Sequence, residues 1–223
     1  MEKIVLATSQ IENIAEILEP ENKNIWAWIG KAKKMGLSDY ALGILPKLRI
    51  HEENEMEGLW LSAEEPEYIA EILEMENNSI SLGKVKILEL CSHAVETLPK
   101  LKFHGEYVME RLGLEALFSE HTAEIPKIEN NSIWIGKMKR LELHFYAIEI
   151  LPKFRIHREN VMEELVLNAD SPEHITKILE AKDKSIWIGR VRKVSPIEHA
   201  KRIKGKLDFT LITPDDQEEN GGD

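Results

Sequence analysis

The sequence predicts an α/β solenoid built from tandem repeats, and three observations lead to that prediction. Fixed landmarks recur every 53 residues along a chain of 223. Short segments of the pattern apolar-x-x-Leu-x-Leu recur inside each repeat and alternate apolar with other positions, as strands with one buried face do. Amphipathic stretches that are typical of short helices follow these segments. Repetition at such a period indicates a stack of small units rather than one globule.

The landmarks define four copies of the repeat. They include a recurrent glycine, the proline of Leu-Pro-Lys and a histidine, found at Gly30, Gly83, Gly136 and Gly189, at Pro46, Pro99 and Pro152, and at His51, His104 and His157. The copies begin near Met1, Met56, Met109 and Met162. The first copy is longer because Trp26-Ala27 is a two-residue insertion. The solenoid is therefore expected to span residues 1–211.

Each copy divides into two similar halves. A first half opens Met162-Glu-Glu-Leu165-Val-Leu167, and a second half opens Met138-Lys-Arg-Leu141-Glu-Leu143. The openings are separated alternately by 24 residues, from 138 to 162, and by 29, from 162 to 191. One strand is expected in each half, which gives eight strands.

The segments between the strands predict helices of two kinds. In the first halves, Pro172 suits a first helical turn, and Ile175, Ile178 and Leu179 share one helical face. In the second halves, a proline such as Pro152 interrupts the apolar stretch, so only a short helical turn is expected there. The alternative fold class is an all-α helical repeat array.

The Leu-x-x-Leu-x-Leu units of 24 and 29 residues resemble leucine-rich repeats over residues 1–211. The resemblance implies a right-handed solenoid with a parallel β-sheet on its concave face and short helices on its convex face. The chain departs from the family at the ninth position, which is usually Asn or Cys. The residues here are Ser9, Glu64, Leu117 and Asp170 in the first halves and Tyr40, His93, Tyr146 and His199 in the second halves. The second-half turns are expected to be closed by ring hydroxyls, imidazoles or water instead.

The resemblance also implies a binding surface. The leucines of each strand would point into the core, and the residues between and beside them would face the concave surface. The central positions vary from unit to unit: Val5, Gly36, Trp60, Glu89, Gly113, Glu142, Val166 and Ser195. The candidate partner-binding residues are Trp60, Glu89, Glu115, Glu142, His144 and Phe145. Trp60 would be the anchor, because buried aromatic side chains dominate binding energy; the alternative is that it packs over Gly36 or Gly113 and binds nothing.

Charges alternate in sign at the second position of all eight strands, in the order Glu2, Lys33, Glu57, Lys86, Glu110, Lys139, Glu163 and Arg192. Neighbouring parallel strands lie about 4.8 Å apart, so each carboxylate would sit between two cations. This pattern predicts a cross-strand charge ladder that sets the register of the strands.

Two further stripes are interpreted as packing features. Tryptophans recur at Trp28, Trp134 and Trp187, and histidines recur at His51, His104 and His157. Copies of one position lie two strands apart, which is too far for successive histidines to share a metal ion. No metal site, no cofactor and no catalytic motif are predicted, so the chain is not expected to be an enzyme.

Composition narrows the setting. The formal net charge of -11 disfavours nucleic-acid binding, which depends on clustered Lys and Arg. A single cysteine, Cys91, excludes a disulfide within the chain, and neither a membrane span nor a signal peptide is predicted. A cytoplasmic location is therefore expected. Residues 212–223 carry five acids and no base and are expected to form a disordered acidic tail.

Two hypotheses for function follow. The first is a non-catalytic module that binds another protein, of unknown identity, on the concave face; by resemblance such a module could regulate or inhibit an enzyme. The second is a structural subunit that docks onto a large assembly, or onto a second copy of itself, through an uncapped N-terminal edge.

Overall fold

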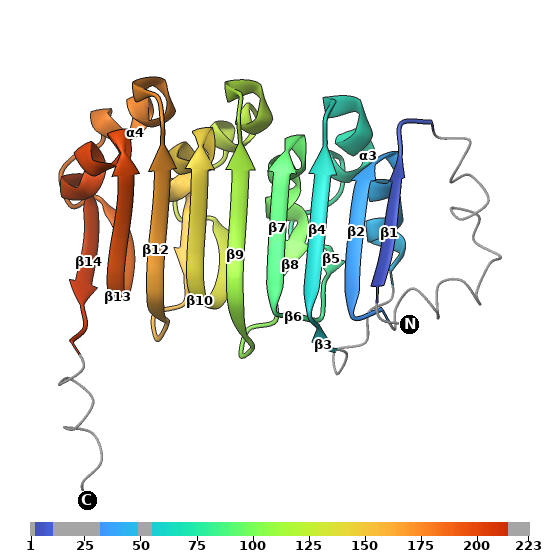
Figure 1. Cartoon of the computed structure of the whole chain (residues 1–223), viewed down its shortest axis with the longest axis horizontal. Helices are drawn as coiled ribbons and strands as arrows, with labels where there is room; N and C mark the ends of the chain where they lie inside the picture. Colours follow the sequence, from blue (N-terminus) through green and yellow to red (C-terminus); the bar gives the residue numbers. More distant parts are fainter. Residues whose placement is uncertain (1–2, 11–31, 49–54, 214–223) are drawn as a thin grey trace, which may run out of the picture.

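The computed structural model describes residues 3–10, 32–48 and 55–213. These residues form an α/β fold in which parallel strands stand side by side in one long row and short helices cover one face of the sheet (Figure 1). The predicted α/β class is confirmed, and the all-α alternative is wrong. Several expectations concern residues outside the described ranges: the insertion at Trp26-Ala27, Trp28, His51 and most of the acidic tail.

All pairings in the main sheet are parallel, as one strand per half requires. The order is β1-β2-β4-β7-β9-β10-β12-β13-β14, with β11 paired to β10. The bounds are β1 Lys3–Thr8, β2 Lys34–Asp39, β4 Gly58–Ala63, β7 Ile87–Ser92, β9 Val108–Ala116, β10 Ile133–Phe145, β11 Phe154–Ile156, β12 Val161–Ala169, β13 Ile186–Glu198 and β14 Leu207–Leu211. Eight of these strands are the expected repeat strands, and five of them, β4, β7, β9, β10 and β12, have both leucines.

Short parallel pairs of a second kind also recur every 53 residues. Ile80 pairs with Leu101, Ile133 with Phe154, and Ile186 with Leu207. The first of these pairs joins β5 (Ile80–Ser81) to β8 (Leu101–Lys102), and a separate pair joins β3 (Glu55–Met56) to β6 (Lys84–Val85). The paired apolar residues are buried. These pairs extend each unit beyond its main strand.

The helices differ from the prediction. Each second half contains an unbroken 3₁₀ helix of eight residues: η2 Tyr40–Lys47, η4 His93–Lys100, η7 Tyr146–Lys153 and η9 His199–Lys206. The first halves contain η3 Pro66–Ile69 with α3 Ala70–Leu73, η5 Ser119–Thr122 and η6 Ile125–Lys127, and η8 Pro172–Ile175 with α4 Thr176–Glu180. The expectation of only a short turn before the proline is wrong. Pro46, Pro99 and Pro152 are the next-to-last residues of their helices, where a missing N–H removes only one bond of the final turn.

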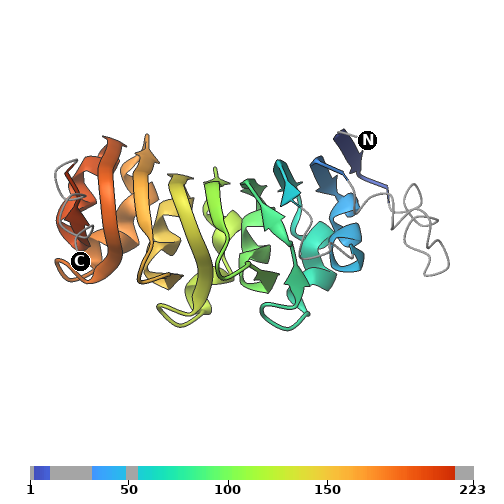
Figure 2. The same cartoon turned by 90° about the horizontal axis from the view of Figure 1, so that it is seen from below.

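The core lies between the sheet and the helices. The two leucines of β4, β7, β9, β10 and β12, such as Leu88 and Leu90 or Leu141 and Leu143, are almost fully buried. Seen from below, the sheet runs along the shallowly concave side of the molecule and the helices lie on the other side (Figure 2). With the strands in front and pointing up, each later strand lies further left and the connections pass behind, so the crossovers are right-handed (Figure 1).

Ring pairs occupy the ends of the strands, where an asparagine ladder is absent. Three of the four second-half rings meet a ring of the next first half: Tyr40 meets Tyr68, His93 meets His121, and Tyr146 meets His174. The centroids are 4.7 to 4.8 Å apart and the rings are edge-on. The rings pack against one another at these positions. Closure of the turns by ring hydroxyls, imidazoles or water stays a prediction.

Candidate functional site

The variable central positions form one row across the sheet. Gly36 pairs with Trp60, Trp60 with Glu89, and Glu89 with Gly113. The row continues through Glu142, Val166 and Ser195 in the same register. The sheet face is therefore built as the repeat pattern predicts, and the candidate residues of this row are Trp60, Glu89 and Glu142.

Trp60 lies flat over its own strand. A Cβ added to Gly58 would collide with the Trp60 ring, whereas one added to Gly36 or Gly113 would meet no atom of that ring within 4 Å. The alternative in which Trp60 packs over Gly36 or Gly113 is wrong. Residues two apart on a strand share a face, so the glycine at position 58 makes room for the ring. Trp60 keeps an exposed surface on the sheet face.

Glu89 and Glu142 are engaged by arginine. Arg111 lies between them and pairs with both: Glu89 is a close partner, and Glu142 Oε2 lies 3.9 Å from Arg111 Nη1. Arg140 pairs with Glu142 and holds Glu164 at 3.0 Å. The Glu142 side chain is only 16% exposed. Both carboxylates are therefore ion-paired within the chain, which the repeat pattern did not predict.

The same network continues to the last strands. Glu164 accepts hydrogen bonds from Lys193 Nζ at 2.7 Å and from Ser195 Oγ at 2.6 Å. These two bonds, with the nearby Arg140 charge, outweigh burial and lower the pKa of the Glu164 carboxyl. We call the connected residues Glu89, Arg111, Arg140, Glu142, Glu164 and Lys193 the face network.

The charge ladder predicted at the second strand position does not form as expected. Among the ion pairs of the described residues, only Lys33 with Glu57, at 4.0 Å, joins two of its members, and Lys86 pairs instead with Glu55 at 2.8 Å. The backbone explains the difference. The N–H groups of Glu110 and Arg111 both donate to the carbonyl of Lys86, at 2.8 and 3.1 Å. Two successive residues thus oppose one acceptor, and regular strand pairing starts one residue later, at Ile87 with Arg111.

The remaining candidates lie near the carboxyl ends of the strands. Glu115 and His144 are register partners, and His144 Nε2 lies 3.9 Å from Glu142 Oε2. Phe145 belongs to the strand end and contacts His174, with ring centroids 5.4 Å apart. Trp60 is two strands from Glu115 and three strands from His144 and Phe145, separations of about 10 and 14 Å across the sheet. Trp60 therefore lies beside Glu89 and His144 lies beside Glu142, so the candidates are spread along the sheet from β4 to β10.

The flank stripes are packing features in the described copies. Trp134 meets the His157 ring at 5.6 Å and the Arg155 guanidinium at 5.2 Å. His157 Nδ1 accepts the N–H of Glu159 at 3.1 Å, and His104 Nδ1 accepts that of Tyr107 at 3.2 Å. Within residues 3–10, 32–48 and 55–213, no group of three or more His, Cys, Asp or Glu side chains is placed to hold a metal ion.

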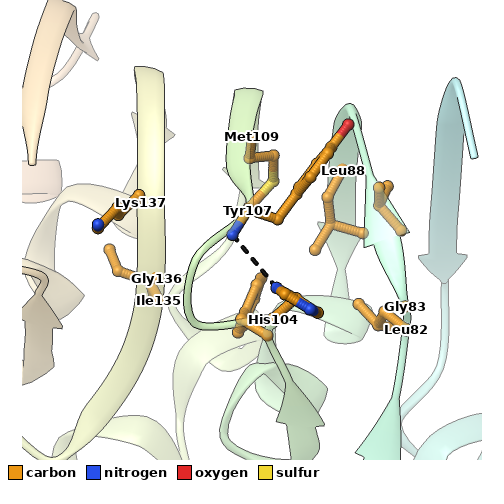
Figure 3. Close-up of a pocket in the computed structure, with 11 residues that line it drawn as sticks. Leu82, Gly83, Leu88, His104, Tyr107, Met109, Ile135, Gly136 and Lys137 are labelled. Atoms are coloured by element: carbon orange, nitrogen blue, oxygen red, sulfur yellow. Dashed lines mark hydrogen bonds between the residues drawn. The ribbon is translucent and has the colours of Figure 1, made fainter. Parts of the chain in front are cut away.

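A small cavity lies beside this stripe (Figure 3). Its lining includes Leu82, Leu88, His104, Tyr107 and Met109, and its volume is about 20 Å³. Such a space suits about one water molecule. It is too small for a substrate.

Cys91 is not an activated nucleophile. Burial, followed by the carboxylates of Glu115, Glu89 and Glu64, raises the pKa of its thiol to about 11. The thiolate is the reactive form of cysteine, and little of it exists at neutral pH at such a pKa.

Sequence reasoning missed an exposed apolar pair at the end of β9. Leu117 is 48% exposed and Phe118 is 54% exposed. The signal that could have found them is their departure from the polar residues at the same repeat positions, Glu64-Glu65 and Asp170-Ser171.

Comparisons of this chain with family models, with curated proteins and with solved structures found no match. In the described part of the chain, every helix is too short or too polar to cross a membrane.

Proposed function

We propose that the chain is a non-catalytic protein-binding module of the leucine-rich-repeat type, which engages another protein on the concave sheet face. The observation that carries the proposal is the row of central residues from Gly36 to Ser195. Its members share one register and one face but change in size and charge from strand to strand. From β4 to β12 the two positions beneath them are buried leucines in every repeat strand. A constant core under a variable surface suits recognition of a specific partner.

The contact residues follow from the geometry of the face. Trp60 offers a large amphipathic side chain at one end of the described face, beside Gly36, whose missing side chain leaves space for a partner. Glu115 and His144 offer polar groups on β9 and β10, in the middle of the sheet. The face network presents fixed charges from β7 to β13, which favour specificity over affinity. Regulation or inhibition of an enzyme is the form of this function that the family resemblance suggests.

Capture from native lysate with matched tryptophan variants tests the proposal. Trp60→Ala should abolish retention of the captured partner, and Trp187→Ala should leave it unchanged. Trp187 is a suitable control because it also lies against a glycine two residues away, Gly189, but on the flank. Thermal unfolding of both variants checks that the fold is kept. Equal capture by the folded Trp60→Ala protein would overturn the sheet-face site.

The second proposal is association through the N-terminal edge of the sheet. Among the described strands, β1 pairs only with β2, and its Val5 is 60% exposed. The C-terminal end of the sheet is less suited to adding a strand. β14 already pairs with residues Ile186–Val191 of β13, and Pro196 of β13 has no N–H to donate to a further strand. Light scattering over a concentration series tests this proposal: the mass should rise with concentration. A constant monomer mass would contradict it.

A further inference from the structure

The exposed pair Leu117 and Phe118, which we call the rim pair, lies where β9 ends and η5 begins. Both side chains are about half exposed, at 48% and 54%. Phe118 is held in place on its inner side, because its ring contacts the buried His121 ring at a centroid distance of 5.3 Å. His121 in turn packs on His93. A large apolar side chain is thus fixed with one side in solvent.

The fold does not require apolar residues at these positions. The same two positions of the other copies carry Ser9-Gln10, Glu64-Glu65 and Asp170-Ser171, and the strands there end in the same way. The core contacts of the unit are made by Leu112, Leu114 and Ala116, which are buried. Exposing Leu and Phe costs solvation free energy and gains no packing that the other copies need. A partner that covers them would recover that free energy.

The surroundings of the rim pair are strongly acidic. In the strand ends and following turns of four neighbouring units, residues 59–73, 88–99, 112–126 and 141–152, every charged residue other than histidine is Asp or Glu. Some of these acids are engaged internally: Glu96 accepts the Glu124 N–H at 2.7 Å, and Glu149 pairs with Lys177. Glu64, Glu65 and Glu120 remain exposed around the pair. The acidic edge therefore repels anionic surfaces and attracts cationic ones.

We infer that the rim pair is the docking point for a basic segment of another protein, in which Lys or Arg residues flank a bulky apolar side chain. The apolar residue would cover Leu117 and Phe118, and the basic residues would meet the acids on either side. This inference rests on the proposed function in that both make the chain a protein-binding module. It uses the carboxyl edge of the sheet, however, and not its concave face.

Selection from a random peptide display library on the folded full-length chain tests the inference. Enriched peptides should combine Lys or Arg with Leu, Ile, Phe, Trp or Met. They should bind Leu117→Asp/Phe118→Ser about tenfold or more weakly than the unmodified chain. That double variant carries the residues that copy four has at these positions, Asp170-Ser171, so it should fold. Leu211→Ser removes an equally exposed apolar side chain at a distant strand end and should leave affinity unchanged.

Further measurements distinguish the alternatives. Peptide binding should weaken as salt is raised, because exposed charges are screened. Peptide binding should be unaffected by Trp60→Ala. The sheet-face proposal and this inference can therefore fail independently of each other. Selection of acidic peptides, or equal affinity for Leu117→Asp/Phe118→Ser, would overturn the inference. It would also be overturned if sedimentation showed that the rim pair joins two copies of this chain.

Discussion

His93 and His121 form a buried pair in the second copy and the unit that follows it, with ring centroids 4.8 Å apart. Burial, followed by the positive charge that His93 can carry, lowers the pKa of His121; the more distant carboxylates of Glu120 and Glu64 act in the opposite direction. The Nδ1 atoms of both rings have no hydrogen-bond partner within the described chain. His93 Nδ1 lies 3.6 Å from Glu96 Oε2, whereas no carboxylate is paired with the His121 ring among the described residues.

The pair predicts acid-sensitive stability. The folded pKa of His121 lies below the ordinary value of 6.5, so protons bind the unfolded chain more tightly. Its contribution to stability is complete above pH 6.5 and declines as the pH falls from there toward the lowered pKa. His121→Tyr, which introduces the residue found at Tyr68, should reduce this decline in a series of thermal melts. The same decline in the variant would contradict the assignment.

Glu96 joins one unit to the next. Its carboxylate is buried and accepts the N–H of Glu124 at 2.7 Å. Glu149 repeats the contact 53 residues later by accepting the N–H of Lys177 at 3.0 Å. Each bond lies between a second half and the helix of the following first half.

Removing this acceptor should cost stability. In Glu96→Ala the Glu124 N–H loses its partner, and we expect the free energy of unfolding to fall by about 1–3 kcal/mol. Glu96→Gln keeps a carbonyl acceptor and should cost less. Urea unfolding of the two variants measures the difference. Equal losses would show that the charge, and not the acceptor, is what matters.

At the scale of the element, the strands were predictable and their ends were not. The spacing of the leucines predicts a buried face, and the strands at Leu88-Leu90 and Leu141-Leu143 have one. The helices after Tyr40 and Tyr146 were underestimated, because a proline near the end of a 3₁₀ helix resembles a breaker in the sequence. The charge ladder failed because residue types do not reveal that two successive N–H groups share one carbonyl.

The candidate site was predictable in part for a similar reason. Periodicity places Trp60, Glu89 and Glu142 on one face, and the structure confirms that placement. Periodicity does not show that Arg111 bridges the two carboxylates, since that depends on side-chain reach across neighbouring strands. A contact of this kind is settled by three-dimensional packing.

The second-half strands share an unusual backbone at their ends. Asp39, Ser92, Phe145 and Glu198 have φ values of 57°, 54°, 59° and 51°. Side chains disfavour positive φ by roughly 1–2 kcal/mol, whereas glycine adopts it freely.

A glycine at one of these ends should therefore stabilise the protein. For Ser92→Gly we expect the free energy of unfolding to rise by up to about 1 kcal/mol, after the entropy of the added glycine is subtracted. Ser62→Gly is the matched control, because Ser62 is a strand residue without positive φ and should lose about 0.5–1 kcal/mol. Urea unfolding compares the two. Destabilisation by both would contradict the assigned strain.

At the scale of the whole molecule, contacts run between neighbouring units, so whole copies should be removable. Deleting residues 109–161 joins Val108 to Met162 and leaves the repeat in phase, with His93 facing His174. We expect a folded protein with a smaller denaturant m-value, because less surface is exposed on unfolding. Deleting residues 109–137 instead places two second halves in succession. The shorter deletion should lower the free energy of unfolding by more for each residue removed. A larger loss per residue in the longer deletion would argue against the alternation of first and second halves.

The ring pairs have a consequence for where the chain can be cut. They join the second half of one copy to the first half of the next, as His93 with His121 and Tyr146 with His174 do. The structural unit that contains a complete ring pair therefore begins half a copy later than the repeat that is read from the sequence. A fragment that starts at Met56 and ends at Val161 leaves Tyr68 and Tyr146 without their partners. A fragment that runs from Val85 to Arg190 keeps the pairs His93 with His121 and Tyr146 with His174, and it is the better minimal domain.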